Sequence, residues 1–86
     1  MPEISRFYGI VVRMYFDEHP PPHFHALYGE YEALIHINTL AIISGKLPGR
    51  ALGLVMEWAL LHQTELSELW ERARRSESLG KIEPLE

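Results

Sequence analysis

The sequence predicts an α+β fold in which a small antiparallel sheet of three to four strands packs against one long C-terminal helix. Two observations indicate this class. The first half alternates short segments rich in β-branched and aromatic residues with turn residues. From Pro48 onward the apolar residues instead recur with a period of about 3.6, which is typical of a helix. A chain of 86 residues has room for one domain, residues 1–86.

Four segments of the first half have the composition of strands, and they are residues 7–16, 23–28, 31–37 and 40–44. Gly9 indicates a bulge or a bend in the first of them. Gly29-Glu30 is a turn between the second and the third. The three prolines at 20–22 predict a stiff, extended connector between the first and second strands, because proline fixes φ.

Residues from about 49 to about 75 are predicted to form one helix, bent near Thr64, and Pro48 suits its first turn. Its apolar residues form a broad stripe that we expect to pack on the sheet. The stripe consists of Leu52, Val55, Met56, Ala59, Leu60, Leu66, Leu69, Trp70 and Ala73. Residues 76–86 are polar, and we expect a loose tail pinned by Ile82 and Leu85.

The hairpin of residues 23–37 gathers histidines. A two-residue turn at Gly29-Glu30 places His23 opposite His36 and gives the hairpin one apolar face. The opposite face then carries His23, His25 and His36. Cross-strand neighbours on one face stand about 5 Å apart, which is close enough for imidazoles to share an ion.

Metal ligation is the first functional interpretation of this pattern. His23, His25 and His36, with His19 from the proline segment, are candidate ligands for a divalent metal such as zinc. Glu18, like Asp17 before it, is a candidate hydrogen-bond partner of the imidazoles. A plainer interpretation is that the histidines are solvent-facing strand residues with no shared task.

A second functional interpretation needs no metal. His23 and His25 are candidate catalytic residues, a general base and a general acid for RNA cleavage, because imidazole titrates near neutral pH. Such chemistry also needs phosphate-binding groups, and Arg13 and Arg6 are the nearest basic residues in the sequence.

Composition limits the choice of partners. The formal net charge of −4 does not favour a nucleic-acid-binding surface, although a local basic patch is compatible with it. The absence of cysteine excludes disulfides and favours a cytoplasmic location. No run of about 18 apolar residues predicts a membrane span.

Association is expected because one helix layer leaves the second sheet face uncovered. That face carries Leu27 and Leu34, and the distal part of the long helix carries Leu66, Leu69 and Trp70. Exposed apolar patches usually mark interfaces, and tryptophan is enriched among the residues that dominate binding energy. We therefore expect a homo-oligomer or a complex with a protein partner.

The segments HPPPHFHA, YGEYEALI, GKLPGRAL, EWA and KIEPL, in that order, resemble the domain-of-unknown-function 4160 family of small bacterial proteins. Such proteins are often encoded beside a small partner of the domain-of-unknown-function 2442 family, and the pair has been proposed as a toxin–antitoxin-like module. The resemblance implies a cytoplasmic protein-interaction component of unsettled activity and supplies no catalytic residues. The motif histidines fall on His19, His23 and His25, whereas the family more often has an acidic residue at the position of His36. A ribonuclease-type toxin, a metal-dependent hydrolase and a structural homodimer remain the alternatives.

Overall fold

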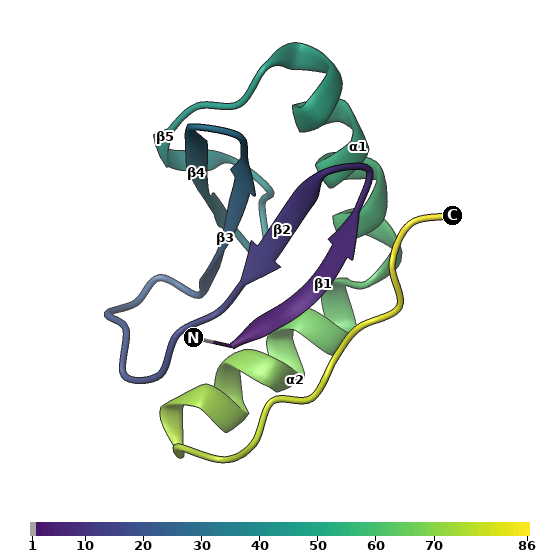
Figure 1. The fold of residues 1–86 in the computed structure, drawn as a ribbon. Coiled ribbons are helices and arrows are strands. Elements are labelled where there is room, and N and C mark those ends of the chain that lie inside the picture. The colour runs from purple at the N-terminus through teal and green to yellow at the C-terminus, as the bar shows by residue number, and fades with distance from the viewer. Residues whose placement is uncertain (1) are drawn as a thin grey trace.

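The computed structural model describes residues 2–86 as five strands followed by two helices (Figure 1). The elements are β1 (Glu3–Phe7), β2 (Ile10–Arg13), β3 (His23–Tyr28), β4 (Tyr31–His36), β5 (Ile42–Gly45), α1 (Gly49–Leu61) and α2 (Gln63–Arg74). Each strand pairs antiparallel with the next, so the sheet is a meander in chain order. The α+β class is confirmed, whereas the three to four strands and the one long helix are wrong in number.

The predicted first strand, residues 7–16, is instead a hairpin of β1 and β2. Tyr8 and Gly9 form its two-residue turn, with φ of 50° and 80°. Two successive positive φ angles match the twist of antiparallel strands, and glycine adopts such an angle without steric cost. Gly9 therefore marks a chain reversal, and β1 begins before the aromatic-rich segment that predicted the strand.

The hairpin of β3 and β4 has the predicted register. His23 pairs with His36, and Phe24 pairs with Ile35. Phe24 and Ile35 are fully buried on the face that meets the helices. The alternation of side chains across the pleat then places His23, His25 and His36 on the opposite face.

Gly45 ends β5 at a place where no side chain fits. Its φ is 78°, and a Cβ atom there would collide with the backbone carbonyl oxygen of Glu32. The same carbonyl accepts a hydrogen bond from the Lys46 amide at 3.1 Å. Glycine at this position therefore allows the close approach of β5 to β4.

The helical part of the chain breaks at His62, which has φ −127° and separates α1 from α2. The predicted bend near Thr64 is thus a full interruption, which changes the helix direction so that both helices lie along the sheet (Figure 1). The Gln63 side chain anchors the break, because its Nε2 donates to the Ile37 carbonyl oxygen at 2.9 Å.

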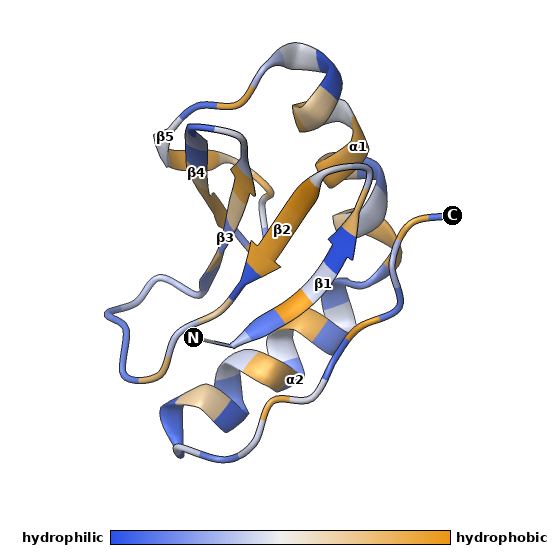
Figure 2. Cartoon of the chain, viewed as in Figure 1, coloured by the Kyte–Doolittle hydropathy of each residue, from blue (hydrophilic) through white to orange (hydrophobic). Residues whose placement is uncertain are grey.

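The core lies between the helices and the sheet, and Trp58 is its largest fully buried side chain. Its ring centroid lies 5.4 Å from that of Phe7 and 5.9 Å from that of Phe24. The prediction that the apolar stripe packs on the sheet is wrong for Leu60, which is 64% exposed. Figure 2 shows the alternation of hydrophobic and hydrophilic residues along both helices. The other stripe members are buried or half-buried.

Residues 76–86 have no helix or strand, but they are not a loose tail. The Ile82 amide donates to the Ile4 carbonyl oxygen at 2.7 Å, and Ile82 is buried. The Trp58 indole donates to the Glu83 carbonyl oxygen at 2.8 Å. The segment therefore runs beside β1 and covers part of that edge of the sheet (Figure 1).

The predicted interface residues of the distal helix are part of the core. Leu66, Leu69 and Trp70 are all buried within this chain. The break at His62 is the physical reason, because it returns the apolar stripe of α2 to the protein interior. Leu27 and Leu34 are half-buried on the sheet face opposite the helices.

Candidate metal centre

His23 and His25 open strand β3 and share one sheet face, yet they are only 5% and 7% exposed. The cover comes from the segment between β2 and β3, residues 14–22, which folds back over this face. Tyr15 of that segment meets the His25 ring edge-on, with ring centroids 4.6 Å apart. The connector bends at Pro20 and Pro21 rather than running extended, and the peptide bond between them is cis.

The fold of residues 14–22 places the Glu18 carboxylate against the imidazoles of His23 and His25. Its Oε1 lies 2.6 Å from His25 Nε2 and 3.2 Å from His23 Nε2. The three ligand atoms all lie within 4.8 Å of one another. Glu18, His23 and His25 are therefore placed to bind one metal ion.

The outer nitrogen of each imidazole is already occupied. His23 Nδ1 lies 2.8 Å from the Pro21 carbonyl oxygen, and His25 Nδ1 lies 2.9 Å from Glu32 Oε2. Since a carbonyl oxygen only accepts, His23 Nδ1 carries the hydrogen and its Nε2 carries the lone pair when the ring is neutral. Metal-ligating histidines are oriented in this way by a carbonyl or a carboxylate.

The inner side of the cluster brings one carboxylate oxygen against two imidazole nitrogens. His23 Nε2 is buried without a hydrogen bond, because its contact with Glu18 at 3.2 Å does not have hydrogen-bond geometry. His25 lies between two carboxylates and satisfies both only as an imidazolium cation. Lone pairs that converge in this way require a proton or a metal ion between them.

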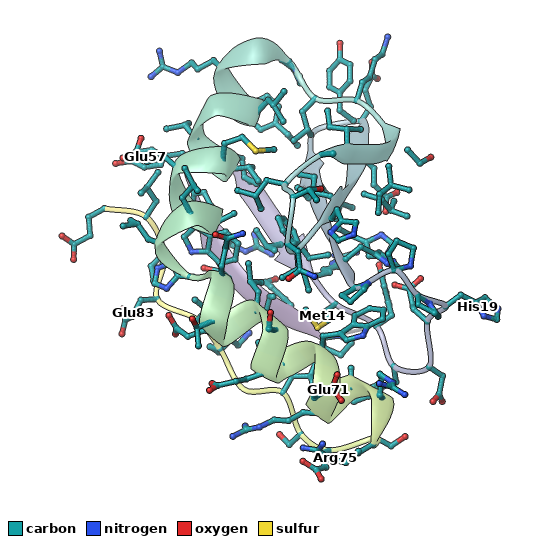
Figure 3. All side chains as sticks on the ribbon, turned by 180° about the vertical axis from the view of Figure 1, so that it is seen from behind. Met14, His19, Glu57, Glu71, Arg75 and Glu83 are labelled. Carbon is teal, nitrogen blue, oxygen red and sulfur yellow. The ribbon has the colours of Figure 1, made fainter. Side chains whose placement is uncertain are left out.

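The other two predicted ligands lie outside this cluster. His36 is on the same sheet face as His23, but its Nδ1 accepts a hydrogen bond from the Asn38 amide at 3.1 Å. His19 is exposed and points away from the protein body (Figure 3). The sequence indicated Glu18 only as a hydrogen-bond partner of the imidazoles, and the structure places it among the ligand atoms.

Helix α2 also reaches the cluster. The buried ring of Trp70 lies 5.3 Å from the His23 ring, centroid to centroid. Trp70 thus forms a wall of the site and connects it to the core. In the sequence, its distal position in the predicted long helix and the enrichment of tryptophan at interfaces indicated contact with a partner, and neither signal distinguishes a partner's surface from a site within the same chain.

The fold and the cluster define a small α+β protein with two histidines and one carboxylate arranged as metal ligands. The chain belongs to the family described as a domain of unknown function, DUF4160, whose profile matches residues 9–71. This match confirms the resemblance found in the sequence, and it includes all three residues of the cluster. The comparisons with curated proteins and with solved structures found no match. Neither helix described in residues 2–86 combines the length and hydrophobicity of a membrane span.

Proposed function

We propose that the protein binds a divalent transition-metal ion through Glu18, His23 and His25. One observation carries the proposal: two buried Nε2 atoms converge on one carboxylate oxygen, while the outer nitrogens are held by the Pro21 carbonyl and Glu32. A bound cation replaces the proton that this arrangement otherwise requires. It also gives His23 Nε2 the partner that it lacks among the described residues.

The ligand types favour zinc or a neighbouring first-row ion. Imidazole nitrogen combined with one carboxylate suits such ions, and the absence of cysteine leaves no thiolate that would favour softer ones. Three protein ligands leave at least one coordination position for water or a substrate, which is typical of catalytic zinc sites. The arrangement therefore favours a metal-dependent hydrolase over a purely structural metal site.

Access to the cluster is compatible with this role. The histidine side chains are enclosed, whereas the Glu18 side chain is 27% exposed. Glu18 also lies on a connecting segment and not on a strand. We therefore expect an ion to reach the cluster from the side of the partly exposed Glu18 carboxylate.

Isothermal titration of chelator-treated protein with Zn²⁺ tests the proposal. We expect one ion per chain, and His23→Ala or His25→Ala should weaken binding at least about 100-fold because each removes a direct ligand. His19→Ala is the matched control, since it removes an exposed histidine from the same segment. Equal zinc affinity of His25→Ala and His19→Ala would contradict the proposal.

We propose, in addition, that the protein associates through strand β5. This edge strand reads IISG, and Ile42 and Ile43 are 40% and 44% exposed. Unpaired edge strands without charged residues pair readily with other strands. The half-buried Leu27 and Leu34 on the uncovered face would extend the contact, and a partner encoded by a neighbouring gene, as in a toxin–antitoxin-like module, is the heteromeric form of this proposal.

Light scattering on the pure protein, and on the product of co-expression with the neighbouring gene, tests association. We expect a dimer or a heteromeric complex, and Ile43→Lys should weaken it by at least about tenfold because a charged residue protects an edge. Glu57→Lys, on the exposed side of α1, is the control. If the protein stays monomeric at high concentration and does not bind the product of the neighbouring gene, the interaction role loses its support.

A further inference from the structure

Arg13 ends strand β2 directly beside the candidate metal centre. It pairs with His25 across the β2–β3 ladder, so the two side chains share one sheet face. Every other lysine and arginine of the chain is exposed, whereas Arg13 is half-buried. Arg13 is thus a half-buried basic residue on the same sheet face as the cluster.

Arg13 has no ion-pair partner among residues 2–86, and its buried Nε has no hydrogen bond there. Its neighbour on β1 is Glu3. That carboxylate is bound by Arg6 at 2.8 and 3.0 Å, and this hydrogen bonding is the main reason that the pKa of Glu3 lies below its ordinary value. Arg13 lowers the pKa of Glu3 only as the weakest of several charges.

The carboxylates on the cluster side are also engaged. Glu18 contacts both histidines, and Glu32 binds His25 Nδ1. A half-buried guanidinium without a partner is unfavourable, because a desolvated charge needs an opposite charge and hydrogen-bond acceptors. The Arg13 guanidinium is therefore available to an anionic ligand from outside the described residues.

We propose that the centre binds a small phosphate monoester, with phosphoryl oxygens shared between the metal ion and Arg13. This inference rests on the proposed metal site, which supplies the open coordination position. The planar guanidinium offers paired N–H donors that match phosphoryl oxygens, and arginine does this better than lysine. The inference names the ligand class that the site would take.

The charge of the site favours an anionic ligand. A divalent ion and the Arg13 guanidinium carry three positive charges against the two negative charges of the Glu18 and Glu32 carboxylates, so the site stays positive. The net charge of −4 for the whole chain opposes a long polyanion. A small monoester therefore fits better than a nucleic-acid backbone.

Phenyl phosphate added to the cobalt(II)-loaded protein provides the test, because the visible spectrum of cobalt(II) changes when a ligand enters its coordination sphere. We expect a saturable spectral change, and Arg13→Gln should weaken phenyl phosphate binding by at least about tenfold. Cobalt affinity should change little, because Arg13 is not among the converging ligands. Arg50→Gln is the matched control, since it removes an exposed arginine of α1 that has no ion pair among the described residues.

Arg13→Lys keeps the positive charge but lacks the paired N–H donors of the planar guanidinium. We expect this variant to bind phenyl phosphate with intermediate affinity. It provides the comparison if Arg13→Gln does not fold. Benzoate is the carboxylate control and a short single-stranded oligonucleotide the polyanion control. Equal binding of benzoate, tighter binding of the oligonucleotide, or unchanged phenyl phosphate binding in both Arg13 variants would overturn this inference. Failure of cobalt(II) to bind would instead overturn the proposed metal site.

Discussion

The two faces of the β3–β4 hairpin are made by alternating residues of the same strands, yet they are buried in different ways. Phe24 and Ile35 lie under the helices, in an apolar core that includes Trp58. His23 and His25 lie under the segment of residues 14–22, which supplies Glu18. The helix-covered face is filled by apolar side chains, whereas the histidine face brings three candidate metal ligands together. The core and the candidate metal centre therefore lie largely on opposite faces of one hairpin, and Trp70 contacts both.

The largest effect is expected on the helix-covered face. Trp58→Ala should lower the free energy of unfolding by about 3–5 kcal/mol, because it removes a fully buried ring that contacts Phe7 and Phe24. Leu60→Ala on the same helix should cost under about 0.5 kcal/mol, since Leu60 is exposed. Denaturant melts measure both values. Similar losses for the two variants would mean that α1 does not pack as described.

A smaller and more selective effect is expected on the histidine face. Glu32→Gln removes the carboxylate that holds His25 Nδ1 while leaving Glu18, His23 and His25 in place. Zinc affinity should fall by about 10- to 100-fold, which is typical for loss of such an orienting group. The stability of the metal-free protein should change little, because the Glu32 side chain is 46% exposed.

Glu30→Gln, in the adjacent turn, is the control for the Glu32 variant because it removes an exposed carboxylate of the same hairpin. An equal loss of zinc affinity in both variants would show that the charge of the hairpin matters and that the contact with His25 Nδ1 does not. A large loss of stability in Glu32→Gln would show that the two faces are not separable.

The register of the hairpin was predictable from the sequence, because alternation of apolar residues and a two-residue turn are local properties. The path of residues 14–22 was not, since it depends on tertiary contacts such as that between Tyr15 and His25. His36 shows that the sheet face of a residue can be predicted from the sequence while the hydrogen bonds of its side chain cannot. It lies on the predicted face, but its Nδ1 bonds to the backbone of its own turn.

The helix break was equally hidden in the sequence. Leu61, His62 and Gln63 include neither proline nor glycine, so local propensity predicts one continuous helix with at most a bend. The interruption is associated with the hydrogen bonds from Gln63 to the end of the sheet, which are separated from it by 25 and 26 positions in sequence. The division of the helix also determines that Leu66 and Trp70 are buried and not exposed.

The C-terminal segment has a consequence for the geometry of assembly. By bonding to Ile4, Ile82 covers part of the β1 edge and leaves β5 as the edge where another strand can pair. In the proposed association through β5, a second copy would join about a two-fold axis, and each copy would then have its pairing surface occupied. Association of this kind would close at two chains and would not propagate into a fibre.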